Sequence, residues 1–193
     1  LLLLLTIITL LLFSIRVEVG GDWYQYIKAI NETNKLYPPN DIGFKLILFV
    51  FNKFNLDYYT FNFLISIIFL TGNYYFLKGF TYKFTIWVFF TPYFYFIVSL
   101  GYLRQSIAIG IILLALYSLR KLKYKISMLL FLFSTIFHST SIILLPVFIL
   151  CYLKNNKINP FVIFLSISIC IFFIMFVLLN FNSFYFRINS YIF

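Results

Sequence analysis

The stretch LRQSIAIGIILLALYSLRKLKYK, residues 103–125, decides the fold. Residues 103–119 form an almost uninterrupted apolar run, and a cluster of Arg and Lys follows it directly. An α-helix needs about 20 residues of this character to cross the hydrocarbon core of a bilayer. Basic residues beside such a helix favour the cytoplasmic side of the membrane. The stretch therefore predicts a membrane-spanning helix that ends in the cytoplasm.

The rest of the 193-residue chain has the same apolar character. Hydrophobic residues make up 63% of it and charged residues only 10%, whereas a soluble domain carries about 25% charged residues. We therefore expect an all-α, polytopic membrane protein. The chain opens without Met inside an apolar run, and no signal-peptide pattern precedes that run. We expect a single integral membrane domain, residues 1–193, that is a fragment of a longer chain.

The apolar runs predict about six or seven transmembrane or re-entrant helices. The apolar run at residues 126–153 is too long for one simple span and too short for two full spans. We expect the polar sequence at residues 138–141 to divide this run into two short helices that meet in a re-entrant tip. Residues 43–54 are too short to span and repeat apolar side chains at helical spacing, which predicts a helix on the membrane surface. The remaining predicted spans are residues 1–15, 59–77, 84–100 and 160–179.

The distribution of charge orients these spans. With the basic cluster in the cytoplasm, residues 16–57 lie outside as a polar, aromatic loop followed by the surface helix. If residues 43–54 span the membrane instead, the first helix starts outside and residues 16–41 lie in the cytoplasm. Arg104 and His138 are ionisable residues within apolar runs, where they are costly and are candidates for function. Each lies roughly 20–24 Å of helix from the basic cluster. We therefore expect both near the outer face, on the side of the acidic residues, which are Glu18, Asp22, Glu32, Asp41 and Asp57.

Several classes of function are excluded by the sequence. The net charge of +10 does not indicate nucleic-acid binding, because the basic residues lie at the ends of apolar spans, where they face lipid headgroups. The single His, with Cys151 and Cys170 in apolar runs, does not make a metal site. A phosphate-binding glycine-rich loop is also missing from the sequence. We expect membrane lipid as a partner, and neither a metal nor a cofactor.

Four short motifs carry a family resemblance over residues 14–153. In chain order they are Arg16-x-x-x-Gly20-Gly21-Asp22-x-x-x-Tyr26, Asp41-x-Gly43-Phe44, Leu103-Arg104-Gln105-x-x-Ala108 and Phe137-His138-x-x-Ser141. This order and spacing resemble the EpsG family of Wzy-like polysaccharide polymerases. The family usually has Gly-Thr-Asp in the first motif and Glu-Pro-Gly-(Tyr/Phe) in the second, so the chain departs at both but keeps both carboxylates.

The resemblance implies a metal-independent membrane glycosyltransferase. It would polymerise undecaprenyl-diphosphate-linked oligosaccharide repeat units into exopolysaccharide, capsule or O-antigen. The site would face outward from a bacterial cytoplasmic membrane, and other polysaccharide-assembly membrane proteins are candidate partners. Arginine suits the diphosphate, aromatic rings suit the sugars, and a carboxylate or imidazole suits the role of base. The implied substrate-binding residues are Arg16, Arg104, Gln105, Trp23 and Tyr26, and the base is one of Asp22, Asp41 and His138.

Two other functions are compatible with these residues. A flippase or transporter of lipid-linked sugars could also use Arg104 and a polar break within a helix, although the spans show no inverted repeat. A polysaccharide-modifying acyltransferase could use His138, and would need a second polar group close to it.

Overall fold

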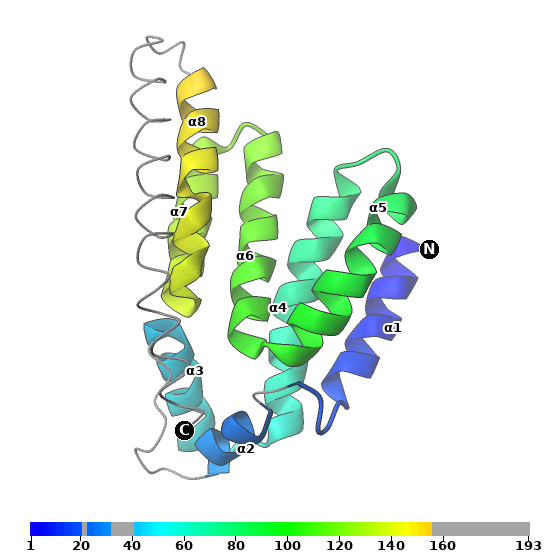
Figure 1. The fold of residues 1–193 in the computed structure, drawn as a ribbon, viewed down its shortest axis with the longest axis vertical. Helices are drawn as coiled ribbons and strands as arrows, with labels where there is room; N and C mark the ends of the chain where they lie inside the picture. Colours follow the sequence, from blue (N-terminus) through cyan, green and yellow to red (C-terminus); the bar gives the residue numbers. More distant parts are fainter. Residues whose placement is uncertain (21–22, 32–40, 156–193) are drawn as a thin grey trace, which may run out of the picture. The chain divides into compact units, whose positions relative to one another are not determined.

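The computed structural model describes residues 1–20, 23–31 and 41–155 (Figure 1). The described part of the chain is helical and contains no strand, so the predicted all-α class is confirmed. Residues 1–142 form one compact unit and residues 143–193 a second. The predicted span at residues 160–179 lies outside the described residues, and the single domain over residues 1–193 stays a prediction.

The first unit is built around helix α6 (Leu103–Arg120). Helix α4 (Tyr58–Lys78) packs along one side of α6 and α7 (Tyr124–Phe137) along another, while α1 (Leu2–Ser14) packs on α4. Within the described residues, α4 and α6 are the two helices long and apolar enough to cross a membrane. The runs at residues 1–15, 59–77 and 103–119 are therefore helices close to the predicted bounds.

Helices α4 and α6 approach each other closely at two glycines. A Cβ on Gly110 would lie 2.7 Å from the backbone Cα of Phe69, and one on Gly72 would collide with the Gly110 carbonyl. Small residues at a helix interface let two backbones come together, which is how membrane helices associate without a hydrophobic driving force. These glycines set the spacing of the central helix pair.

The predicted span at residues 84–100 forms one continuous helical segment with a change of register. It starts as α5 (Lys83–Phe90) and continues as the π-helix η1 (Thr91–Ser99), which has a proline near its start. Pro92 has no backbone N–H, so the ordinary i→i−4 hydrogen bond cannot form there. The wider π turn accommodates this loss.

The polar break predicted at residues 138–141 is confirmed. Helix α7 ends at Phe137, and His138 is extended, with φ −153° and ψ 107°. The 3-10 turn η2 (Ser139–Leu144) follows, and then α8 (Leu145–Asn155) in the second unit. The re-entrant course of these two helices stays a prediction.

The loop predicted between the first span and the surface helix is partly wrong. It contains helix α2 (Trp23–Asn31), which packs on α3 (Ile42–Lys53). Tyr26 and Ile30 lie one helical turn apart and are both buried, so α2 forms because it has an apolar stripe to cover. Helix α3 matches the helix predicted at residues 43–54.

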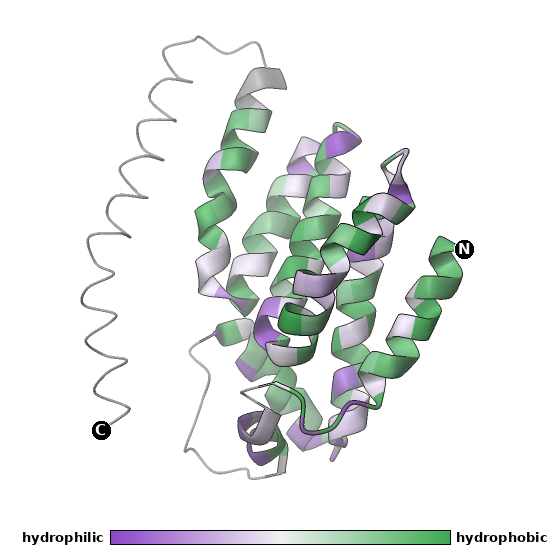
Figure 2. Ribbon diagram, turned by 45° about the vertical axis from the view of Figure 1, so that its right-hand side comes forward, coloured by the Kyte–Doolittle hydropathy of each residue, from purple (hydrophilic) through white to green (hydrophobic). Residues whose placement is uncertain are grey.

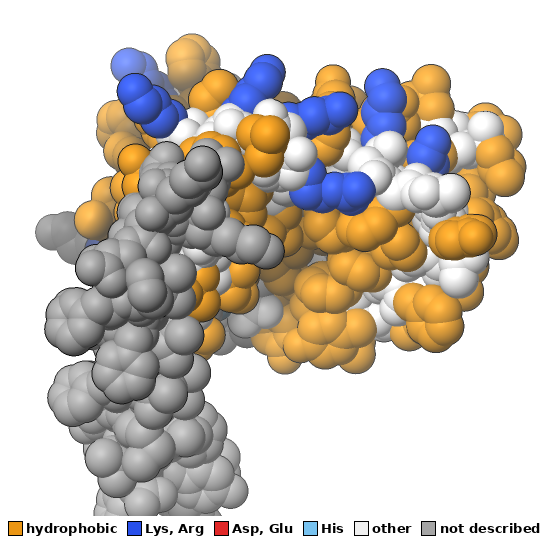
Figure 3. Space-filling view, turned by 90° about the horizontal axis from the view of Figure 1, so that it is seen from above, with side chains coloured by type: hydrophobic (Ala, Val, Ile, Leu, Met, Phe, Trp, Pro, Cys, Tyr) orange, Lys and Arg blue, Asp and Glu red, His pale blue; other side chains and the backbone are white. Residues whose placement is uncertain are grey.

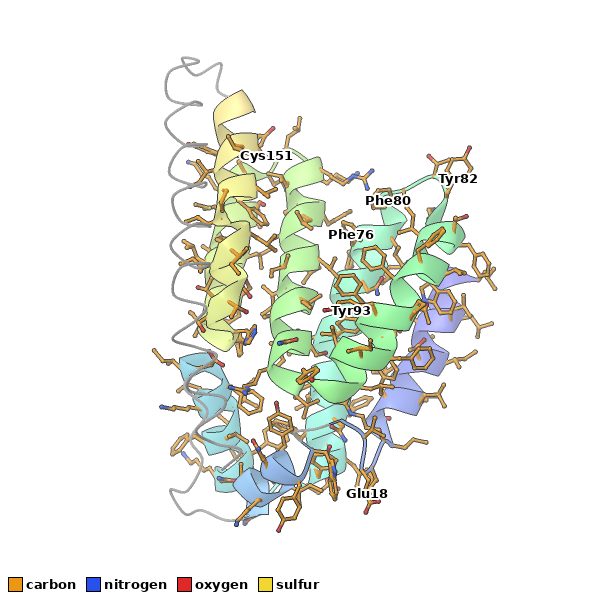
Figure 4. The ribbon with its side chains drawn as sticks, viewed as in Figure 1. Glu18, Phe76, Phe80, Tyr82, Tyr93 and Cys151 are labelled. Carbon is orange, nitrogen blue, oxygen red and sulfur yellow. The ribbon has the colours of Figure 1, made fainter. Side chains whose placement is uncertain are left out.

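Charge and hydropathy divide the first unit into an apolar body and a basic end. Figure 2 shows apolar sequence along the helices, and Figure 3 shows Lys and Arg without Asp or Glu at one end. Figure 4 places Tyr82 at this end and Glu18 at the other. This asymmetry agrees with the predicted orientation, although the sidedness itself stays a prediction. The exposed basic residues of this end are Lys78, Lys83, Arg120, Lys121, Lys123 and Lys125.

Candidate functional site

Asp41 is the residue on which the candidate site is built. It stands at the N-cap of α3, yet its side chain makes no hydrogen bond to that helix, although capping is the usual role of an aspartate there. Its Oδ2 lies 3.2 Å from Nη1 of Arg104, and its Oδ1 accepts a 3.3 Å hydrogen bond from the Ser139 backbone N–H. One carboxylate therefore links the starts of α3 and α6 to the break after α7.

His138 lies beside the same carboxylate. Its Nδ1 is 3.9 Å from Oδ2 of Asp41, is buried and has no hydrogen-bond partner in the structure. The extended backbone at this residue ends α7 and brings the following N–H to Asp41. We call Asp41, Arg104 and His138 the charged cluster. These three residues come from three of the four motifs.

The charged cluster is partly open to solvent. The side chain of Asp41 is 7% exposed, that of His138 20% and that of Arg104 31%. Arg104 lies in the first turn of α6, whose N-cap residue Tyr102 provides no side-chain cap. Unsatisfied N–H groups at a helix start favour an anion. Arginine and helix terminus together are an arrangement suited to an anion, at the opposite end of α6 from Arg120.

Arg16 occupies a different environment. Its side chain is buried, its Nε donates to Oδ1 of Asn62 at 3.3 Å, and its Nη1 donates to the Ser99 carbonyl. The Asn62 amide returns a 3.2 Å hydrogen bond to the Arg16 carbonyl. Burial lowers the pKa of the Arg16 guanidinium to about 10, so it stays charged at neutral pH. These contacts fasten the end of α1 to α4 and η1.

The segment after Arg16 packs against the turn that leads into α6. Gly20 has φ +93°, and a Cβ there would lie 2.5 Å from Cα of Gly101. Only glycine tolerates both the backbone conformation and the close approach. The Gly20–Gly101 contact therefore sets the first motif directly beside the start of the Arg104 motif.

The other predicted site residues lie around this core. Trp23 is half-buried and packs edge-on against Tyr24, with ring centroids 5.9 Å apart. Tyr26 is only 5% exposed and packs on Phe44, which places its ring in the core rather than on an open sugar-binding surface. Gln105 is half-buried next to Arg104. Asp22 lies outside the described residues.

Three groups in these contacts were not predicted. The backbone N–H of Ser139 could not be predicted as a site group, because every residue except proline has a backbone N–H. Asn62 and Ser99 are polar residues inside apolar runs, and Asn62 in particular was a signal of a buried polar contact. Among the described side chains, no three of His, Cys, Asp and Glu gather in a way that would hold a metal ion.

These features fit a helical membrane protein: an apolar body, a basic end and a charged cluster at the other end. The chain belongs to the EpsG family, whose family model matches residues 1–193. The resemblance carried by the four motifs is thus confirmed, and the family indicates a role related to polysaccharide polymerisation. No significant match was found among curated proteins or among solved structures.

Proposed function

We propose that this chain is a glycosyltransferase that polymerises undecaprenyl-diphosphate-linked repeat units into exopolysaccharide, capsule or O-antigen. The observation that carries the proposal is the meeting of Asp41, Arg104 and His138 from three distant motifs of an EpsG family member. The site would face the extracytoplasmic side of a bacterial cytoplasmic membrane, opposite the basic end.

The reaction requires a base, an anion site and an activated donor. The acceptor hydroxyl oxygen bonds to the anomeric carbon of the donor glycan, and the bond from that carbon to the diphosphate oxygen breaks. The electron pair leaves with the lipid diphosphate, and the hydroxyl proton passes to the imidazole of His138. Arg104, with Gln105 and the start of α6, holds the diphosphate. A guanidinium has five N–H donors, so it can hold a carboxylate and a phosphate together.

The contacts support His138 as the base and Asp41 as the residue that positions it. Both oxygens of Asp41 lie next to donors, Arg104 on one side and the Ser139 N–H on the other. The buried Nδ1 of His138 faces this carboxylate, which is the arrangement by which an acidic group orients a catalytic imidazole. Asp22 stays a candidate for acid–base chemistry, and Trp23 for stacking on a sugar ring.

The test follows surface polysaccharide in a deletion strain that carries the full-length gene. We expect His138→Ala and Arg104→Ala to leave single repeat units on the surface while protein levels in the membrane stay normal. Wild-type chain length in both variants would contradict the proposed roles. Accumulation of lipid-linked units on the cytoplasmic side would instead identify a transporter.

Acyl transfer is the second candidate, because the Asp41–His138 pair provides the polar partner that an acyltransferase histidine needs. The same strains separate the two functions. His138→Ala with unchanged chain length but without acyl groups on the polymer would favour acyl transfer.

A further inference from the structure

An apolar groove lies beside the charged cluster. It has a volume of about 440 Å³ and is lined by α3, the first half of α4 and the end of α7. This volume is within the range of roughly 300–1,000 Å³ of small-molecule sites. Every residue that lines the groove is apolar or glycine, so it suits a hydrocarbon and not a sugar or a phosphate.

The groove ends next to the charged cluster, on two of the helices that carry the cluster. Gly43, two residues after Asp41, lines it, and Phe137, the residue before His138, lines it too. A Cβ on Gly43 would lie 2.9 Å from the Phe137 ring, so α3 and α7 touch where the groove meets the cluster. Helices α3 and α7 are accordingly in direct contact. The groove and the charged cluster are therefore neighbours in the structure.

The groove opens on the outside of the first unit. Five of its residues are exposed, with exposed fractions between 40% and 60%. In the proposed membrane orientation we expect lipid to lie against these exposed apolar residues, so that a chain can enter sideways from the bilayer. These residues are Leu46, Val50, Leu64, Phe133 and Ile136.

We propose that this groove holds the isoprenoid chain of the lipid-linked substrate, an inference that rests on the proposed function. That substrate joins a diphosphate to a long hydrocarbon, and the structure places an anion-binding position next to an apolar groove. Because lipid tails are as apolar as leucine, the groove gains no hydrophobic driving force over the bilayer. Its effect is orientation: it fixes the first isoprene units, and so holds the diphosphate at Arg104 and the anomeric carbon near His138.

Site-specific photocrosslinking tests this proposal. The full-length protein carries a photoreactive amino acid at Leu46 or Leu64 in the groove, or at Phe49 or Leu129 as matched controls. The controls are exposed apolar residues of α3 and α7 that do not line the groove. The probe is radiolabelled undecaprenyl diphosphate in phosphatidylcholine proteoliposomes. We expect the groove positions to be labelled roughly tenfold more strongly than the controls, equivalent to about 1.4 kcal/mol of preference.

Three results would overturn the proposal. Equal labelling at groove and control positions would mean ordinary contact with bilayer lipid. If excess phosphatidylglycerol removes the groove labelling as effectively as unlabelled undecaprenyl diphosphate does, the groove is a phospholipid site. A crosslink to another part of the same chain would mean that the protein itself covers the groove.

The outcome is separable from that of the proposed function. His138→Ala removes the proposed base but leaves the groove, so it should keep the crosslink at Leu46 while losing polymer. Crosslinking with normal polymer in His138→Ala would leave the lipid site standing and refute the polymerase mechanism. Polymer loss without preferential crosslinking would refute the groove alone.

Discussion

Replacement of Asp41 separates its structural role from its role in the reaction. Asp41→Ala removes one partner of Arg104 and the acceptor of the Ser139 N–H. Hydrogen bonds to a charged group contribute about 1.5–3 kcal/mol, but Arg104 is 31% exposed and its pairing is screened. The 3.3 Å bond from Ser139 is also long. We expect a loss of about 2 kcal/mol in the free energy of unfolding, seen as a melting temperature lower by about 4–8 °C in detergent.

Asp41→Asn is the more discriminating variant. Its amide oxygen can still accept from the Ser139 N–H, so we expect a smaller loss of stability, about 1 kcal/mol. The negative charge beside Arg104 and His138 is gone, however, and the histidine is no longer oriented by a carboxylate. We expect both Asp41 variants to leave single repeat units on the cell surface, with membrane levels of the protein measured alongside.

Asp57→Asn is the matched control. Asp57 is an exposed acidic residue that does cap its helix, α4, by accepting from the N–H of Thr60 at 2.9 Å. Hydrogen bonds from the Thr60 hydroxyl and backbone keep the pKa of Asp57 below its ordinary value, so it is charged at neutral pH. We expect Asp57→Asn to lower the melting temperature and leave polymer length unchanged. The reasoning is refuted if Asp41→Asn makes full-length polymer, or if Asp57→Asn shortens it as strongly at equal protein level.

Three further predictions concern the helix packing, Arg16 and the orientation. Gly72→Ala should push α4 and α6 apart and lower the free energy of unfolding by about 1–3 kcal/mol, measured by thermal melting. Gly101→Ala is the control, because a Cβ at Gly101 would have its nearest neighbour at 3.9 Å, and it should be nearly neutral in the same experiment. Arg16→Met leaves Oδ1 of Asn62 and the Ser99 carbonyl without the hydrogen bonds that Arg16 donates. Because this role is structural, polymer yield should fall only in proportion to the amount of folded protein. Loss of activity at a normal protein level would instead indicate that Arg16 contacts the substrate. In a cysteine-free background, Lys121→Cys should react with an impermeant thiol reagent only from the cytoplasm, and Asp57→Cys only from outside; the reverse labelling would invert the proposed topology.

The sequence predicts the parts of this fold that depend on hydrophobicity. The apolar runs indicate α1, α4 and α6 to within a few residues, and the polar residues after Phe137 indicate the break there. Helix α2 was predicted as a loop because its polar and aromatic residues hide a short apolar stripe. Tyr26 and Ile30 lie one turn apart in that stripe, and they are buried because α2 packs against α3.

The candidate site is predictable in its members but not in its contacts. Ionisable residues in apolar runs are costly, which singles out Arg104 and His138 from one sequence. The pairing of Asp41 with both depends on how α3, α6 and α7 pack, and no local pattern encodes that packing. The family resemblance implied the same substrate-binding role for Arg16 as for Arg104, yet Arg16 is buried and donates to Asn62 and to the Ser99 carbonyl. Residue type alone did not distinguish the arginine that is partly open to solvent, Arg104, from the one buried inside the bundle, Arg16.

The dispersal of the charged cluster along the chain has a consequence for biosynthesis. Arg104 follows Asp41 by 63 residues and Ser139 follows it by 98. At roughly 5–20 residues per second, a ribosome delivers these groups several seconds apart. During that interval the nascent protein has Asp41, and then Arg104 as well, but no imidazole. A chain cut short before His138 therefore lacks the proposed base, and under the proposed mechanism it binds a lipid-linked sugar without transferring it.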